Sequence, residues 1–116
     1  MSEHRIRLRG AWDCNIPGDE DMEEISFRVD LPTAWSEETR FPLHLVRRFG
    51  RPPLDPERER VELEFRSVPG LISIRLNGSE IPLPDARGDG ELSIELDRTL
   101  LPRNALMLEL DERARQ

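Results

Sequence analysis

Hydrophobic and polar residues alternate with a period of two over most of the chain. A strand with this period has one apolar and one polar face, which is typical of antiparallel sheets with one side in water. The pattern predicts seven strands, at 6–8, 25–31, 43–49, 61–65, 72–76, 92–96 and 106–110. No segment keeps a helical period for three turns. The sequence therefore predicts an all-β protein.

Turn-forming residues separate the predicted strands. Pro17-Gly18 and Pro69-Gly70 interrupt the alternation, and Asn77-Gly78 lies between two apolar runs. Both residues of Asn77-Gly78 tolerate positive φ, so this pair predicts a two-residue type I′ hairpin turn. Many short strands with regular turns indicate an antiparallel β-sandwich of about seven to eight strands.

Length and composition favour one domain spanning residues 1–116, with frayed ends at 1–3 and 112–116. Cys14 is the single cysteine, so no internal disulfide forms. The N-terminus has no apolar signal segment, and no window reaches the length of a membrane span. These features predict a soluble cytoplasmic protein.

The net charge of −7 disfavours nucleic acid and anionic membranes as partners, because both are bound through cationic surfaces. All 17 basic residues are arginine. The first strand presents arginines to solvent, whereas those at Glu62, Glu91 and Glu109 present acids. We expect these opposite charges to help set the order of the strands.

Several short motifs occur in a fixed order along the chain. They comprise Leu8-Arg9-Gly10-Ala11-Trp12, Leu31-Pro32 with Trp35, Val46-Arg47-Arg48-Phe49 leading to Pro52, 60–65, Ile74-Arg75-Leu76-Asn77-Gly78, 92–96, Leu100-Leu101 and Arg103-Asn104-Ala105-Leu106. The series resembles the N-terminal sugar-binding domain of glycoside hydrolase family 2. The resemblance implies a jelly roll of the galactose-binding-like class. The family's catalytic glutamates lie on a separate barrel that is absent here, so it implies no hydrolysis.

Two groups of residues are candidates for binding a ligand. Trp35 follows Leu31-Pro32 in a predicted loop, where its ring would either stack on a sugar or cover the edge of the sandwich. Arg47, Arg48 and Arg51 form a basic cluster that could hold a carboxylate or phosphate. The alternative for the arginines is ion pairing with the surplus of acidic residues.

The acidic run 13–24 has the ligand spacing of a calcium-binding loop. Oxygen ligands stand at its first, third, ninth and twelfth positions, which are Asp13, Asn15, Asp21 and Glu24, and Gly18 stands at the sixth. This spacing matches that pattern. Pro17 replaces one expected ligand, and strands rather than helices flank the run, so the alternative is a solvated acidic loop. The candidate metal ligands are Asp13, Asn15, Asp19, Asp21 and Glu24. No other cofactor is expected.

The sequence supplies no recognisable catalytic constellation. His4 and His44 are far apart in sequence, and Cys14 has no metal-spaced partner. The sequence therefore predicts a non-catalytic β-sandwich module that binds a carbohydrate or a similar polar ligand. The alternative is a protein-interaction or self-associating module, with Val46, Leu71 and Met107 as apolar residues on polar strand faces.

Overall fold

The computed structural model describes residues 2–31, 33–37, 39–51, 59–84, 91–96 and 100–115. The described residues form nine strands and one short 3₁₀ helix, so the prediction of an all-β protein is confirmed. The elements are β1 (Ser2–Arg7), β2 (Ala11–Ile16), β3 (Ile25–Asp30), β4 (Leu43–Gly50), β5 (Glu59–Arg66), β6 (Leu71–Leu76), β7 (Ser79–Ile81), β8 (Glu91–Leu96), β9 (Arg103–Leu110) and η1 (Glu112–Arg115).

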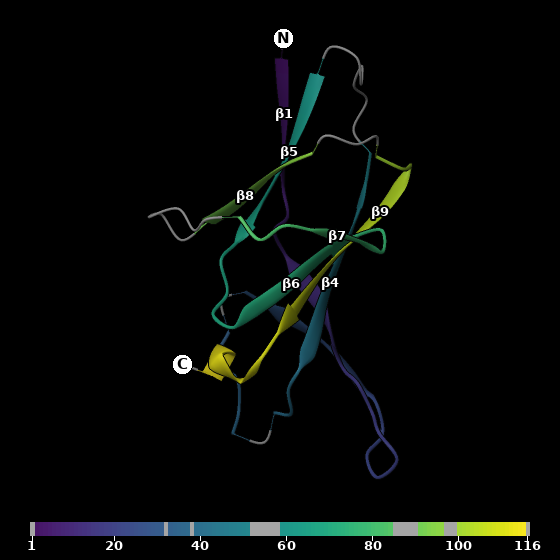
Figure 1. Cartoon of the computed structure of the whole chain (residues 1–116), viewed down its shortest axis with the longest axis vertical. Helices are drawn as coiled ribbons and strands as arrows, with labels where there is room; N and C mark the ends of the chain where they lie inside the picture. Colours follow the sequence, from purple (N-terminus) through teal and green to yellow (C-terminus); the bar gives the residue numbers. More distant parts are fainter. Residues whose placement is uncertain are drawn as a thin grey trace.

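The described strands form two sheets, as expected of a β-sandwich (Figure 1). One has three strands in the order β1-β5-β8, and the other has six in the order β3-β2-β4-β9-β6-β7. Most of the apolar residues predicted by the alternation face the space between the sheets, where Leu45, Leu63, Ile74 and Leu108 are fully buried. Ile25, Phe27 and Ile72 are exceptions and are exposed. A single cluster of buried residues joins both sheets.

One strand pair departs from the antiparallel prediction. β1 runs parallel to β5, with Ser2 opposite Glu59 and Arg7 opposite Glu64. This register places the arginines of β1 beside the glutamates of β5, as the charge pattern predicts. The alternation predicts antiparallel sheets in general, but it does not fix the direction of any one pair, because parallel and antiparallel neighbours have the same side-chain period.

The sequence analysis overlooked β2. Trp12, Cys14 and Ile16 are buried, whereas Asp13 and Asn15 point away from the core. The run 13–24 was treated as one acidic loop, but its first four residues belong to a strand paired with both β3 and β4. The burial of Trp12 and Ile16 stabilises the strand despite its acidic neighbour.

The predicted hairpin turn is confirmed. Asn77 and Gly78 both have positive φ, at 52° and 85°, as a type I′ turn requires. Leu76 and Ser79 pair across the turn, so the two-residue connection joins β6 to β7.

The chain ends in η1, where the sequence predicts a frayed tail. Ala114 is buried against the core, and Arg115 donates to the backbone oxygens of Glu37 and Thr39. These contacts order residues 112–115. At the other end, Ser2 and Glu3 already pair with β5.

Candidate ligand-binding cleft

A cleft of about 390 Å³ lies where the chain passes from β1 to β2 and so from one sheet to the other. Pockets of roughly 300–1,000 Å³ hold small-molecule ligands in other proteins. The cleft has an apolar floor and a charged rim. Its lining residues are Arg7, Leu8, Arg9, Gly10, Trp12, Leu31, Glu64, Phe65, Arg66 and Glu91.

The connection 8–10 shapes the cleft. The backbone amide of Leu8 donates to the Glu64 carbonyl oxygen at 2.8 Å, which continues the parallel ladder beyond β1. Gly10 then turns the chain with φ of +86°, a conformation that other residues rarely adopt. Nε of Arg47 donates to the Arg9 carbonyl oxygen at 3.1 Å and holds the turn against β4.

Buried apolar side chains form the floor of the cleft. Trp12 and Phe65 are each only 1% exposed, and their rings meet edge to face with centroids 6.3 Å apart. Leu8 is buried beside them. A ligand in the cleft would touch the margins of this layer, because Trp12 offers almost no free ring face.

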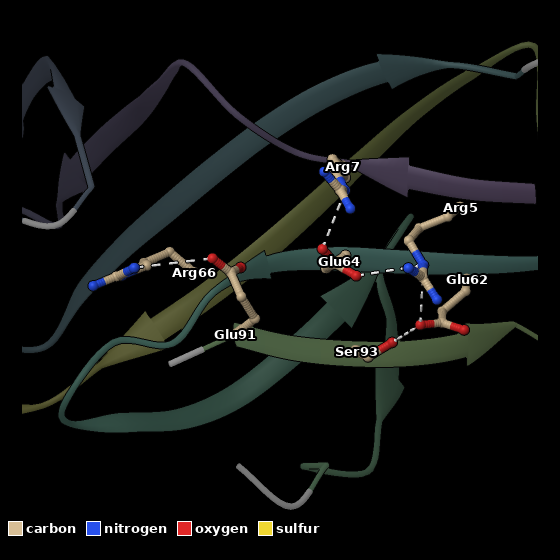
Figure 2. A network of polar contacts seen from close by, with 7 residues as sticks. All are labelled: Arg5, Arg7, Glu62, Glu64, Arg66, Glu91 and Ser93. Atoms are coloured by element: carbon tan, nitrogen blue, oxygen red, sulfur yellow. Dashed lines mark hydrogen bonds and ion pairs between the residues drawn. The ribbon is translucent and has the colours of Figure 1, made fainter. Parts of the chain in front are cut away.

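The rim of the cleft contains two arginine–glutamate pairs (Figure 2). Glu64 is only 8% exposed and lies between two arginines of β1, with Oε1 3.3 Å from Nε of Arg7 and Oε2 3.4 Å from Nε of Arg5. Nη1 of Arg66 lies 3.9 Å from Oε1 of Glu91. The rim therefore offers hydrogen-bond donors and acceptors side by side.

The polar network continues from the rim across the outer face of the three-stranded sheet (Figure 2). Nε of Arg5 lies 3.7 Å from Oε1 of Glu62, and the Ser93 hydroxyl donates to the same oxygen. Arg5 therefore bridges two neighbouring glutamates of β5. This arrangement fixes the carboxylate of Glu64 at the edge of the cleft.

The three arginines of the predicted basic cluster do not converge on one point. Arg47 donates to the backbone oxygens of Arg9 and Arg48, and Arg51 donates to the Leu100 oxygen at 3.3 Å. Nη1 of Arg48 contacts Oδ2 of Asp13 at 3.0 Å. Only Arg47 lies near the cleft, and it acts there through the backbone of the 8–10 turn.

Trp35 lies in the connection between β3 and β4. Its ring meets Phe41 edge to face, with centroids 6.5 Å apart, and it packs against the core in a partly buried position. The guanidinium of Arg115 covers the other ring, 5.0 Å from the Phe41 centroid. This environment matches the edge-covering alternative for Trp35 better than the stacking platform.

The candidate calcium ligands are divided between two elements. Asp13 pairs with Arg28 and Arg48, at 3.4 and 3.0 Å, and Asn15 lies beside it on the outer face of β2. Oδ1 of Asp19 accepts from the backbone amides of Asp21 and Met22, both at 2.8 Å. Glu24 lies immediately before β3 and is exposed.

The rest of the described chain also holds no cluster of metal-ligating side chains. Among those residues, no three His, Cys, Asp or Glu side chains are close enough together to hold a metal ion. Asp13 and Asp19 are engaged in the contacts just described, which favour the alternative of a solvated acidic loop. Calcium binding by this run stays a prediction.

Two side chains of types that often take part in catalysis, His44 and Cys14, lie outside the cleft. Nε2 of His44 lies 3.1 Å from Oε1 of Glu109 on the outer face of the six-stranded sheet, between β4 and β9. Cys14 is fully buried, and its burial raises the pKa of the thiol to about 11. Neither group borders the cleft. The side chain of His4 lies outside the described set.

The sequence analysis missed the cleft residues as a site. Arg7, Glu64, Arg66 and Glu91 all occur in alternating strands, where a charged residue normally faces solvent. The one local signal of the cleft is the pair Arg9-Gly10, which lies between the end of β1 and the beginning of β2. Its position beside the end of β5 depends on long-range pairing that a single sequence does not reveal.

Comparison of the chain with models of protein families, with curated proteins and with solved structures gives no match. A separate feature concerns membranes. Within the described ranges, no helix has both the length and the apolar character needed to cross a bilayer.

Proposed function

We propose that this protein is a non-catalytic β-sandwich module that binds a small carbohydrate in the cleft between β1 and β2. The observation that supports the proposal is the position of two arginine–glutamate pairs, Arg7–Glu64 and Arg66–Glu91, on the rim of one cavity. Each sugar hydroxyl both donates and accepts hydrogen bonds. A rim with guanidinium donors next to carboxylate acceptors is complementary to such groups.

The geometry of the cleft also favours a small ligand. A volume of about 390 Å³ is near the lower end of the range of small-molecule pockets, roughly 300–1,000 Å³. Because Glu64 is held by two arginines, its oxygens are oriented before a ligand arrives. Such preorganisation lowers the entropy lost on binding.

The resemblance to the sugar-binding domain of glycoside hydrolase family 2 supports the same class of ligand. Its first motif, Leu8 to Trp12, forms the turn that shapes the cleft. A non-catalytic role follows from that resemblance, in which hydrolysis is carried out by a different domain. Carbohydrate binding is therefore proposed for a cleft shaped by a motif of that resemblance, although the sequence itself singles out other residues, Trp35, Arg47, Arg48 and Arg51, as ligand candidates.

The proposal can be tested by NMR titration of the full chain with a panel of neutral and acidic monosaccharides and disaccharides at millimolar concentration. We expect saturable shifts of backbone amides at 7–12, 64–66 and 91. A ligand present at about ten times its Kd would also raise the free energy of unfolding by roughly 1.4 kcal/mol.

Two variants make the test specific. Arg66→Gln and Glu91→Gln each remove one partner of an exposed rim pair, and we expect either change to weaken binding while leaving the fold intact. Arg75→Gln, on the opposite sheet, is the matched control and should bind normally. Absence of saturable shifts for every sugar, or equal binding by Arg66→Gln and the wild type, would refute the proposal.

A further inference from the structure

We propose that β3 forms a homodimer interface by pairing antiparallel with β3 of a second copy of this chain. This inference is independent of the ligand and does not involve the cleft. It arises from the exposed apolar side chains of one edge strand and from the charges that flank them.

Exposed large hydrophobic residues concentrate at β3. Met22, Ile25 and Phe27 are 47, 44 and 39% exposed. They make up half of the large exposed hydrophobic side chains among the described residues, and the other three occur at scattered positions. Contiguous exposed apolar side chains mark interaction surfaces more often than isolated ones do.

The hairpin β2–β3 explains why these residues are exposed. Ile25 and Phe27 lie opposite Ile16 and Cys14, so they share the face that β2 directs into the core. Ile16 and Cys14 are buried, but one strand further out the opposing sheet no longer covers this face. In Figure 1 the loop that joins β2 to β3 projects away from the body of the sandwich.

β3 is also an edge strand. It lies at the end of the six-stranded sheet and, in the described part of the chain, pairs with β2 alone. A free edge presents unpaired backbone amides and carbonyls, and pairing with an identical edge satisfies them. An antiparallel pair of identical strands has two-fold symmetry, so the assembly closes at two copies.

The sequence around β3 selects one register for this pairing. A two-fold axis through Ser26 places Ile25 opposite Phe27 of the second copy, which joins the two apolar patches. The same register places Glu24 opposite Arg28 of the second copy, twice in the dimer. Centring on Phe27 instead would oppose Glu24 and Asp30, and centring on Arg28 would oppose two arginines. Charge complementarity therefore favours the Ser26 register.

Arg28 is placed to form an ion pair with Glu24 of the second copy. Its side chain is 80% exposed, and its Nε lies 3.4 Å from Asp13. Asp13 has a closer partner in Arg48, at 3.0 Å. The terminal nitrogens of Arg28 can thus pair with a carboxylate from another chain while Asp13 keeps its own partner.

The apolar residues singled out in the sequence do not form this surface. Val46 and Met107 lie opposite each other in the middle of the six-stranded sheet, where both strand edges are already paired. Leu71 packs against the core. We therefore place the proposed self-association at β3 rather than at these residues.

Sedimentation velocity of the full chain over a range from micromolar to millimolar concentration tests the proposal. We expect a reversible monomer–dimer equilibrium. Phe27→Lys should give a monomer throughout, because it places two like charges in the apolar centre. Leu83→Lys, at a residue that is 50% exposed elsewhere, is the matched control and should dimerise like the wild type.

A charge-reversal cycle tests the register. Glu24→Arg and Arg28→Glu should each raise the dimer Kd about tenfold, since two exposed ion pairs become repulsive, and the double variant should restore dimerisation. Circular dichroism checks that every variant is folded. A wild-type chain that stays monomeric, a Phe27→Lys dimer, or single reversals without effect would overturn the proposal.

Discussion

The side-chain amide of Asn77 donates to Oδ1 of Asn104 at 3.0 Å and so joins the turn of the β6–β7 hairpin to the beginning of β9. Oδ1 of Asn77 in turn accepts from the backbone amide of Ala105 at 2.8 Å. Asn104 is only 3% exposed and also bonds both backbone groups of Leu101, at 2.9 and 2.8 Å. Two residues that are distant in sequence thus share one partly buried hydrogen-bond network.

Replacement of Asn104 should destabilise the fold strongly. Asn104→Ala removes the partner of the backbone groups of Leu101 and of the amide of Asn77, and each hydrogen bond lost costs about 0.5–1.5 kcal/mol. We expect urea denaturation to show a loss of about 2–4 kcal/mol in the free energy of unfolding. Asn77→Ala should cost less, since the tip of the turn is open to water.

The glycines at 70 and 78 should respond differently to alanine. Both have positive φ, so each substitution carries a conformational cost of about 1 kcal/mol. A Cβ at Gly78 meets no atom within 4 Å, whereas one at Gly70 would lie 2.6 Å from the backbone nitrogen of Ala114. Gly70→Ala should therefore also displace η1 and lower the melting temperature well below that of Gly78→Ala. Equal melting temperatures would contradict this account.

Arg47 and Arg48 are adjacent in sequence but should differ in their effect on the cleft. Arg47→Met removes the donor that holds the Arg9 carbonyl, so amide resonances of residues 8–12 should shift. Arg48→Met removes an exposed ion pair with Asp13, worth about 0–1 kcal/mol, and should leave those resonances in place. The spectra of the two variants serve as controls for each other.

Cys14 should be chemically inert in the folded protein. Its burial raises the pKa of the thiol from the ordinary 9.0 to about 11, so the thiolate is scarce at neutral pH. Ellman's reagent should react with the chain only after denaturant is added. Rapid labelling of the native protein would show that β2 opens readily.

The same pKa predicts a loss of stability in alkali. The unfolded thiol ionises near pH 9 and the folded thiol near pH 11, so the unfolded state binds fewer protons between these values. The free energy of unfolding should fall as the pH rises through this window, by about 3 kcal/mol at most. Cys14→Ala, itself less stable, should show a shallower decline.

Local patterns were sufficient to predict most of the strands. The alternation at 43–49, 92–96 and 106–110 corresponds to β4, β8 and β9, and Asn77-Gly78 to the turn before β7. β2 was not predicted because Asp13 and Asn15 have the spacing of calcium ligands, although Trp12 and Ile16 carry the period of two that is typical of a strand. Residues 13–16 fit both a metal-binding loop and a strand, and the burial of the apolar side chains of β2 favours the strand.

The cleft and the parallel pairing of β1 could not be predicted in this way. Both depend on which distant strands become neighbours, whereas periodicity reports only which side of a strand is apolar. The charge pattern marks the arginines of β1 and the glutamates of β5 as complementary, but it does not predict that the two strands run parallel. Likewise, the sequence predicts that Arg47 holds a carboxylate or phosphate or pairs with an acidic residue, whereas it donates to the backbone of the 8–10 turn.

The parallel pairing of β1 also bears on how the chain is made. Ser2 lies opposite Glu59, and β5 is the one strand neighbour that β1 has in the described part of the chain. During synthesis, β1 therefore has no strand partner in the described part of the chain until β5 has also been made. Hairpins such as β6–β7 close over short distances, whereas this ladder closes over a long one and is slower to form. During synthesis β1 thus stays unpaired for longer than strands that close hairpins, and it has more time to meet chaperones.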